Sequence, residues 1–543
     1  MKTDSLPSRA RLLPPLMLAA TAAFVFFFRL GERGFENKDT VWYVEIAWEM
    51  LRSGDWIVPR FNAVIFTEKP VLFIWLVAAS ARIAGGITPF ISRFPSALAA
   101  FGCVFVTLAL GKRLLGRRAA LLAAFVLSTN YAFAWEARTC MVDMVFTFFV
   151  TLALYLLYRG FSDGGHRGHW FIPAYFAAGL AALTKGPLGV VLPALVSLVY
   201  LAWQRRLKFL REMRIPWGIL IVAGIQAAWY APYLVRIGPD GRRFFYEMYV
   251  YKENLLRFTS GFDKAEPFWF YAPAILSHFL PWSILLVLYP FIPRPAEDTG
   301  APRDRAFPAA WFLGLFAFLT LSSGKHSRYA LPLYPAAALL AGDAWDRLIA
   351  SGAGRMSRAV SATAAAFAAG GAVGIPIYAW FAAPGFFIPS ILLSALLVAS
   401  AAGVFCAQPD EKASAAFIAV VVAFACFWAV FIASLPAHEA QRAEHARLAR
   451  QISPAVGTGR LATYGLFSRR LALGFFTGRT VNYIDREEHL SDYLRSGERV
   501  FCLMETAEYE KLREKLPPHA KATGGYRYRK FDLVLISTDG VRP

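Results

Sequence analysis

The sequence predicts an α-helical membrane protein that crosses the bilayer many times, and its composition is the first evidence. Hydrophobic residues make up 57% of the 543-residue chain, charged residues make up 17%, and the mean hydropathy is +0.44. A soluble domain is roughly 45 to 50% apolar and about 25% charged. A membrane-spanning helix needs about 20 apolar residues, because the hydrocarbon is about 30 Å thick. The composition therefore excludes a soluble enzyme, a disordered chain and a secreted disulfide scaffold.

The second observation is a series of apolar segments along residues 12–434. About thirteen membrane spans are expected, each close to the length that a bilayer requires. They lie near residues 12–30, 95–112, 118–135, 142–158, 170–184, 187–204, 216–236, 270–290, 307–322, 330–348, 359–382, 388–407 and 413–434. No small-residue cleavage site precedes Arg29, so we interpret the first segment as an uncleaved span and not as a signal peptide.

The third observation is the distribution of the positive charge. The formal net charge is +20, and most arginines lie in short connectors between apolar segments instead of on one basic face. This distribution argues against a nucleic-acid partner and follows the positive-inside rule for membrane proteins. With the N-terminus in the cytoplasm, the basic connectors share the inner side; they are residues 111–118, 158–169, 204–214, 293–305 and 346–358. The chain after residue 434 is then extracytoplasmic.

Two segments of the first outer loop are expected to be interfacial helices. Residues 71–83 are apolar but number only about 13, and counting them as a span would invert every later connector. Residues 39–52 have helical spacing, with Glu45, Glu49 and Arg52 on a polar stripe. We predict that both helices lie at the outer membrane surface.

The predicted organisation has two domains. Residues 1–435 form the transmembrane domain, with outer loops at 31–92 and 236–269, and residues 436–543 form a small soluble extracytoplasmic α/β domain. The tail alternates helical and strand-like patterns, as such domains do. Helical patterns occur at 439–451 and 506–516, and strand-like runs occur at 460–464, 500–504 and 531–536.

Several cations are predicted on the outer side, against the positive-inside bias. They are Lys69, Lys185, Arg257, Lys325 and Arg328. Cations at headgroup depth can bind a lipid phosphate through charge-assisted hydrogen bonds. A snorkelling role for Lys185, and a surface ion pair between Glu68 and Lys69, are the alternative interpretations.

Two outer carboxylates complete the pattern. Asp39 opens an interfacial helix, where a role as a helix N-cap is the alternative, and Asp143 opens a span, where an isolated carboxylate is costly. A carboxylate beside a phosphate-binding cation can accept a proton from an incoming hydroxyl. The pattern therefore suits transfer of a group from a phosphate-linked lipid to an acceptor on the outer face.

Ordered motifs over roughly residues 10–350 carry a family resemblance. After Asp39 come GDWIVPRFN, EKP, RxPSAL, a GRR connector, ARTxxxD, LTKGP, EPFWFY and GKxxxYxLPLYP. This series resembles the protein O-mannosyltransferase and aminoarabinose transferase family. Its members are integral-membrane glycosyltransferases of the GT-C type that use polyprenyl-phosphate sugars. The resemblance implies the GT-C fold for this chain.

The resemblance also implies roles for matching residues. Asp39 matches the catalytic carboxylate of the first loop, and Asp143 matches the second acidic position. Lys69 and Arg257 match cations that bind the donor phosphate. The remaining matches are Tyr329, which would line the donor cavity, and Glu68, whose counterpart in some relatives belongs to a divalent-metal site. The family's histidine after the loop glutamate is Asn254 here, which weakens the case for a metal.

The sequence thus predicts an inverting glycosyltransferase of the inner membrane, with its active site on the periplasmic side. The donor would be a sugar on undecaprenyl phosphate, for example 4-amino-4-deoxy-L-arabinose. The acceptor would be lipid A, another envelope glycan or a protein, as for a protein O-mannosyltransferase. An O-antigen ligase or polymerase, which uses diphosphate-linked donors, is the enzyme alternative. A transporter is disfavoured, because the expected spans are nearly free of midplane charge.

Overall fold

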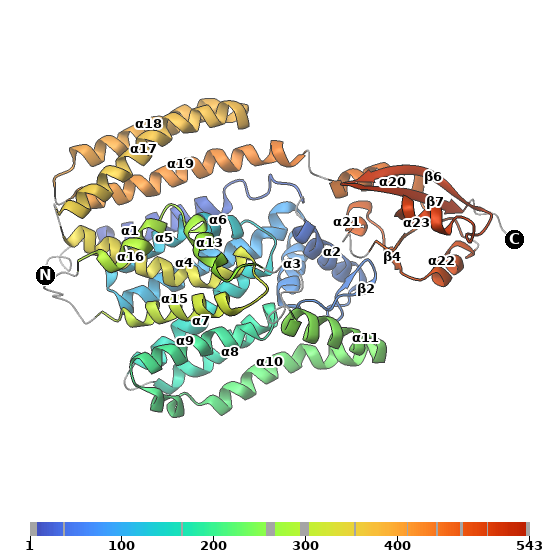
Figure 1. Ribbon diagram of the computed structural model, residues 1–543, viewed down its shortest axis with the longest axis horizontal. Helices are drawn as coiled ribbons and strands as arrows, with labels where there is room; N and C mark the ends of the chain where they lie inside the picture. Colours follow the sequence, from blue (N-terminus) through green and yellow to red (C-terminus); the bar gives the residue numbers. More distant parts are fainter. Residues whose placement is uncertain are drawn as a thin grey trace. The chain divides into compact units, whose positions relative to one another are not determined.

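The structure is a computed structural model, and helices make up most of it (Figure 1). It describes residues 8–35, 38–163, 167–256, 266–293, 303–351, 354–409, 411–440, 444–466, 471–496 and 498–538. The chain divides into two compact units, each built from segments distant in sequence. The first, called here the membrane unit, comprises residues 1–30, 93–231 and 246–435. The second, called here the outer unit, comprises residues 31–92, 232–245 and 436–543.

The helices of the membrane unit coincide with the apolar segments of the sequence. Their bounds are α1 Ser8–Phe27, α4 Pro89–Leu114, α5 Arg117–Ser128, α6 Tyr131–Glu136, α7 Val142–Ser162, α8 Arg167–Lys185, α9 Leu188–Trp203, α10 Ile215–Arg236, α13 Tyr271–His278, α14 Ser283–Leu288, α15 Ala306–Leu321, α16 Tyr334–Ala350, α17 Arg355–Ala382, α18 Phe387–Cys406 and α19 Lys412–Ala440. The short 3-10 segments are η1 Leu207–Glu212, η3 Phe268–Phe270, η4 Tyr289–Phe291, η5 Ser327–Leu333 and η6 Pro384–Phe386, and η2 Tyr246–Leu256 is a π-helix.

Every expected span falls on a helix, which confirms the polytopic helical class. Among the described residues, six helices are long and apolar enough to cross a membrane by length and composition. A bent pair brings that number to seven if it is counted as one span. Several other helices on the expected segments are shorter than 18 residues, such as α9 and α15. The expected total of about thirteen spans therefore stays a prediction.

The expected span near residues 270–290 is broken in the middle. The segment bends by 118° between α13 with its preceding turn and α14 with its following turn. The segment between α5 and α6 supplies hydrogen bonds at this break. The Tyr131 amide donates to the Leu280 carbonyl at 2.9 Å, and the Trp282 indole donates to the Thr129 hydroxyl at 3.0 Å. Backbone groups freed at a bend can thus be satisfied within an apolar protein interior.

Small residues let the helices of the membrane unit approach closely. A Cβ atom on Gly342 of α16 would lie 2.6 Å from the backbone nitrogen of Ala123 in α5. A Cβ atom on Gly111 of α4 would lie 2.9 Å from the side chain of Ala120. Without hydrophobic driving force between helices in lipid, close van der Waals packing of this kind is what holds them together.

The outer unit combines first-loop helices with a mixed sheet. Its elements are α2 Lys38–Ser53, β1 Arg60–Phe61, β2 Val64–Ile65, α3 Leu72–Ala84, α11 Gly238–Phe245, α20 Glu444–Val456, β3 Arg460–Tyr464, α21 Leu473–Thr477, β4 Val481–Ile484, α22 Glu487–Leu494, β5 Val500–Glu505, α23 Thr506–Leu512, β6 Ala520–Tyr528 and β7 Phe531–Thr538. The five-stranded sheet has the order β4-β3-β5-β7-β6, in which β4, β3 and β5 are parallel and β7 and β6 are antiparallel to their neighbours.

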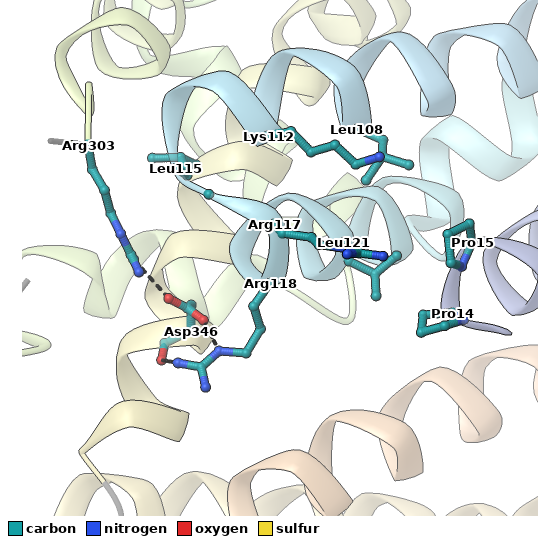
Figure 2. A pocket seen from close by; sticks show the side chains of 11 residues that line it. Pro14, Pro15, Leu108, Lys112, Leu115, Arg117, Arg118, Leu121, Arg303 and Asp346 are labelled. Atoms are coloured by element: carbon teal, nitrogen blue, oxygen red, sulfur yellow. Dashed lines mark hydrogen bonds and ion pairs between the residues drawn. The ribbon is translucent and has the colours of Figure 1, made fainter. Parts of the chain in front are cut away.

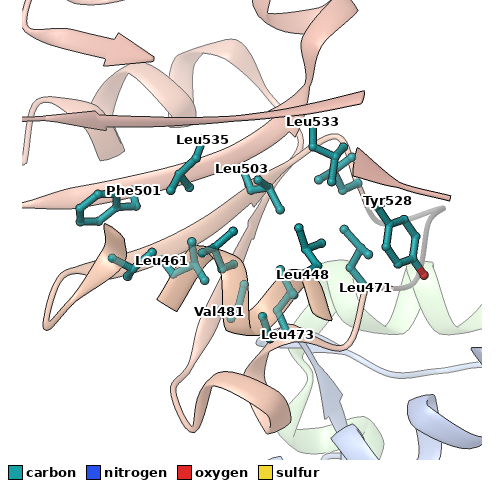
Figure 3. Packing of buried hydrophobic residues seen from close by; sticks show 14 residues of the cluster. Leu448, Leu461, Leu471, Leu473, Val481, Phe501, Leu503, Tyr528, Leu533 and Leu535 are labelled. Atoms are coloured by element: carbon teal, nitrogen blue, oxygen red, sulfur yellow. The ribbon is translucent and has the colours of Figure 1, made fainter. Parts of the chain in front are cut away.

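Alternating side chains give this sheet a core on each face. Leu461, Leu503 and Leu535 pack with Leu448 of α20 on one face, as Figure 3 shows. Their strand neighbours, such as Cys502, point into the other core beside α22 and α23. This period of two is expected for strands buried on both sides. It confirms the three strands and the small α/β fold that the tail predicts.

The structure corrects the interpretation of the polar stripe on α2. Glu45 and Glu49, expected at the outer surface, are buried with 0% and 9% of their surface exposed. Glu45 accepts a hydrogen bond from the backbone amide of Phe475 at 2.7 Å, and Glu49 accepts one from the amide of Ala63. Burial raises the pKa of Glu45 to about 8 and that of Glu49 to about 7. The two carboxyls are therefore internal acceptors of the outer unit.

The raised pKa of Glu45 predicts a pH-dependent stability. A carboxyl whose pKa rises from 4.5 to about 8 on folding holds an extra proton in the folded state across that window. The stabilisation is complete below pH 4.5 and is lost as the pH rises towards 8, by at most about 1.4 kcal/mol per pH unit. Glu45→Gln, which keeps a hydrogen-bond acceptor, should remove this loss.

We expect the thermal midpoint of Glu45→Gln, relative to the parent chain, to rise from pH 5 to pH 8 and then to level off. Differential scanning fluorimetry of the full chain in detergent measures it. Glu514→Gln, on an exposed residue, is the matched control and should show no such trend. If the thermal midpoints of Glu45→Gln and the parent chain differed by the same amount at every pH, the raised pKa of Glu45 would be contradicted.

Candidate functional site

A buried ion pair joins two helices of the membrane unit. Lys185 Nζ lies 2.5 Å from Asp143 Oδ1, and the two side chains are 13% and 4% exposed. Asp143 lies in the first turn of α7 and Lys185 in the last turn of α8, so each charge also meets the favourable end of its own helix dipole. Neither charge would be stable alone in a low-dielectric interior, so each one keeps the other ionised.

The turn after Lys185 requires glycine. Gly186 has φ +93°, a left-handed conformation that L-residues with a side chain rarely adopt. A Cβ atom there would lie 2.6 Å from the hydroxyl of Tyr249 in the second outer loop. The LTKGP motif therefore fixes the position of Lys185: the lysine ends α8, the glycine turns the chain, and Pro187 precedes α9.

The turn η5 brings further predicted residues to this ion pair. Lys185 Nζ lies 4.5 Å from the ring centroid of Tyr329, within cation–π distance. The guanidinium of Arg328 contacts the ring nitrogens of His326 and reaches the sulfur of Met141, which caps the start of α7. Four sequence-predicted site residues thus gather in one place. We call the group Asp143, Lys185, Arg328 and Tyr329 the α7–α8 cluster.

Glu136 is a member of this neighbourhood that sequence reasoning missed. It ends the short helix α6 and accepts a hydrogen bond from the Thr139 hydroxyl at 3.2 Å. Burial and the nearby Asp143 carboxylate raise the pKa of Glu136 to about 7, while Arg328 and Lys185 act in the opposite direction. The signal available in the sequence was its position one residue before the ARTxxxD motif, at the end of an expected span.

Lys325 is buried in the same turn and contacts carbonyl oxygens. Its Nζ donates to the Ser322 carbonyl and lies 3.4 Å from the Glu266 carbonyl. These contacts connect the start of η5 with the aromatic EPFWFY segment. The hydroxyl of Tyr271, from the same segment, donates to the His326 carbonyl at 3.3 Å. Lys325 thus fixes the loop that carries Arg328 and Tyr329.

The other predicted site residues are placed less fully. Asp39 lies in the first turn of α2, and its side chain is outside the described residues. Arg257 also lies outside the described residues. Glu68 and Lys69 are partly buried residues of the outer unit that precede α3. Their roles at a catalytic site stay predictions.

A metal site at Glu68 finds no support in the part of the chain that the structure describes. Within it, no three His, Cys, Asp or Glu side chains are grouped so that they could hold a metal ion. A divalent cation normally takes several carboxylate or carbonyl oxygens, or imidazole and thiolate ligands. We therefore derive no chemical step through a metal.

Comparison with known proteins connects this geometry to a family. Residues 68–231 match the model of the dolichyl-phosphate-mannose-protein mannosyltransferase family. The chain is 31% identical over 359 residues to undecaprenyl phosphate-alpha-4-amino-4-deoxy-L-arabinose arabinosyl transferase 1 of Pseudomonas fluorescens, covering 64% of this chain and 60% of that protein. It is 32% identical over 330 residues to an uncharacterised protein of Aquifex aeolicus, covering 60% and 63%. The chain thus matches somewhat over half the length of these curated relatives.

Solved structures extend the likeness to nearly the whole chain. The crystal structure of ArnT from Cupriavidus metallidurans bound to undecaprenyl phosphate superposes with a TM-score of 0.75 at 22% identity, covering 98% of this chain and 99% of ArnT. The chain therefore has the fold of ArnT. The archaeal oligosaccharyltransferase AglB from Archaeoglobus fulgidus shares the fold more distantly, with a TM-score of 0.52 at 12% identity over 92% of this chain and 69% of AglB. The expected GT-C fold is confirmed.

The buried ion pair between Asp143 and Lys185 predicts a specific pattern of stability. Lys185→Met leaves Asp143 buried without its cation, which should cost about 3–5 kcal/mol. The double variant, which adds Asp143→Asn to Lys185→Met, removes the uncompensated charge. It should regain much of the lost free energy of unfolding. Thermal unfolding of the full chain, followed by fluorescence-detected gel filtration, compares the parent chain with both variants. Equal destabilisation by the single and double variants would contradict the pairing.

Proposed function

We propose that this chain is an integral-membrane glycosyltransferase that moves a sugar from a polyprenyl phosphate to an acceptor. The observation that carries the proposal is the α7–α8 cluster in a membrane protein with the ArnT fold. Its Lys185 ammonium group pairs with the Asp143 carboxylate and lies over the ring of Tyr329. The ArnT relative was solved with undecaprenyl phosphate bound, and the Pseudomonas relative is named for an undecaprenyl-phosphate sugar. Both support a polyprenyl-phosphate donor here.

The cations match the change of charge in such a reaction. The acceptor hydroxyl oxygen attacks the anomeric carbon and forms the new glycosidic bond. The bond from that carbon to the phosphate oxygen breaks, and its electron pair stays on the phosphate. The donor phosphodiester carries one negative charge, and the leaving polyprenyl phosphate carries up to two. Preorganised cations such as Lys185 and Arg328 stabilise this developing charge.

Asp39 is the carboxylate that we assign to the acceptor's proton. It matches the catalytic position of the family and lies in the first turn of α2. An ionised carboxylate can accept the proton as the hydroxyl attacks, and attack opposite to the leaving phosphate inverts the anomeric carbon. Lys69 and Arg257 are assigned to the donor phosphate by the same motif match. Lys325 is assigned to the same site, where its contacts position the loop that carries Arg328.

The named relatives make 4-amino-4-deoxy-L-arabinose the first sugar to test. Lipid A is the first acceptor to test, followed by envelope glycans and proteins. The positive-inside distribution of arginines supports an active site on the periplasmic side of the inner membrane. It also supports an extracytoplasmic position for residues 436–543.

Asp39→Asn should reduce transfer by at least about 100-fold, because general base catalysis contributes that much or more. Proteoliposomes with undecaprenyl-phosphate aminoarabinose and lipid A provide the assay, and mass spectrometry of the products detects the transferred sugar. Asp240→Asn, on an exposed residue of α11, is the matched control. Near-normal turnover in Asp39→Asn, with intact gel-filtration behaviour, would refute the assignment.

Donor binding should weaken as the pH rises through 7. Glu136 is largely neutral below its raised pKa of about 7 and negative above it. With Asp143 ionised, the charge of Glu136, Asp143, Lys185 and Arg328 together falls from +1 to zero across this pH, which disfavours an anionic ligand. Glu136→Gln should remove this step, whereas Asp143, Lys185, Arg328 and the neighbouring His326 are the same in both proteins.

The measurement is the dissociation constant of the undecaprenyl-phosphate sugar between pH 6 and 8.5, for the parent chain and for Glu136→Gln. The phosphodiester does not titrate in this range, and any titration of the sugar's amine is the same for both proteins, so the comparison isolates Glu136. Parallel pH profiles for the two proteins would contradict a role for Glu136 beside the phosphate.

A further inference from the structure

A second charged site of the membrane unit lies apart from the α7–α8 cluster. A pocket of about 500 Å³ is lined by residues of α1, α4, α5 and α16, and by Arg303. Figure 2 shows Lys112 and Arg117 extending beside Leu108 and Leu121, while Arg118 and Arg303 converge on Asp346. The pocket therefore combines a polar side with an apolar one.

The lining carries an excess of positive charge. Four cations line the pocket together with a single carboxylate, that of Asp346. Arg118 and Arg303 both form ion pairs with Asp346, whose side chain is 2% exposed. Lys112 and Arg117 are exposed residues at the connector between α4 and α5. The charge of this lining complements an anion, and arginine in particular matches phosphate oxygens.

The apolar part of the pocket continues onto the surface of α1. Pro14 and Pro15 line the pocket, and their helix neighbours Leu12, Leu13 and Leu16 are 58–62% exposed. An exposed row of leucines next to a basic pocket suits a ligand with a charged head and apolar chains. A free anion such as inorganic phosphate would make no use of it.

This pocket and the α7–α8 cluster lie at opposite ends of α7. Asp143 is in the first turn of that helix, and Asp163 directly follows its last residue. Asp163 pairs at 2.7 Å with Arg113, the neighbour of Lys112 in the pocket. A helix of 21 residues is roughly 31 Å long, about the thickness of the hydrocarbon core. The pocket thus belongs to the other membrane face from the proposed transfer site.

We propose that this pocket binds an anionic phospholipid. Its phosphate lies between Lys112, Arg117 and the Arg118–Arg303 side, and its acyl chains lie along Leu108, Leu121 and the exposed leucines of α1. Basic pockets between membrane helices on the cytoplasmic side are typical sites for anionic headgroups. The connector that carries Lys112 and Arg117 is one of those that the positive-inside rule assigns to the cytoplasm.

Native mass spectrometry of the full chain in detergent tests this proposal. The probes are dioleoyl phosphatidylglycerol, dioleoyl phosphatidylcholine and inorganic phosphate. The variant Lys112→Gln with Arg117→Gln removes two positive charges from the pocket. Lys208→Gln with Arg211→Gln, two exposed residues of another basic connector, removes the same charge elsewhere and is the matched control. All four side chains are exposed, so folding should be unchanged, and gel filtration checks this.

We expect phosphatidylglycerol to bind the parent chain at least tenfold more tightly than phosphatidylcholine. The pocket variant should lose roughly twenty-five-fold in phosphatidylglycerol affinity, because each of its two basic residues contributes on the order of a fivefold gain. The control variant should lose less than twofold. Equal loss in both variants would overturn the proposal, as would equal binding of the two lipids.

A competition experiment and a second variant separate the possible sources of phosphate. Millimolar inorganic phosphate should leave the phosphatidylglycerol adduct intact, and full displacement would show a site for free anions instead. Arg328→Gln removes a cation of the proposed donor site and should leave the phosphatidylglycerol affinity unchanged, because the pocket and the α7–α8 cluster lie at opposite ends of α7. A loss in Arg328→Gln as large as that in the pocket variant would place the lipid in the donor site and refute the second site. This outcome is independent of whether sugar transfer itself is confirmed.

Discussion

The polar site of the membrane unit depends on the ion pair between Asp143 and Lys185. The pair connects the N-terminal end of α7 to the C-terminal end of α8, and it positions the Lys185 ammonium group against the ring of Tyr329. Neither charge is stable in an apolar interior without its partner. The tight turn at Gly186 and the loop held by Lys325 then bring further groups to the same place. The ion pair therefore lies where α7, α8, the Tyr249 segment and η5 meet.

This arrangement gives a role to the lysine at the end of α8, which departs from the predicted positive-inside pattern. A lysine that snorkels to the headgroups would present its ammonium group to water. Here the side chain is only 13% exposed and faces a carboxylate and an aromatic ring. A cation already held in position requires no reorganisation when negative charge develops on a leaving phosphate. Lys185 thus serves both the stability of the buried ion pair and the proposed binding of the phosphate.

The sequence predicted the features that local patterns determine. Apolar runs marked the helices, and alternating apolar residues marked β3, β5 and β7. Both edge strands were missed: β4 has only four residues, and the sequence of β6, AKATGGYRY, is polar and contains two glycines. The burial of Glu45 was also missed, since its partner Phe475 lies 430 positions away. Contacts between distant segments are invisible in a single sequence, whatever their strength.

The same holds for the site: its individual residues could be predicted from local sequence patterns, but the contacts between them could not. Asp143 and Lys185 were each singled out for their positional cost, but their pairing across 42 residues was not predicted. The structure then divides the basic excess of the chain between the two ends of α7. One end carries the few cations around Asp143, and the other carries basic residues of the connectors, such as Lys112 and Arg117. If these connector residues hold an anionic headgroup, as proposed, then one set of basic residues would account for both the charge distribution of the sequence and lipid binding by the folded protein.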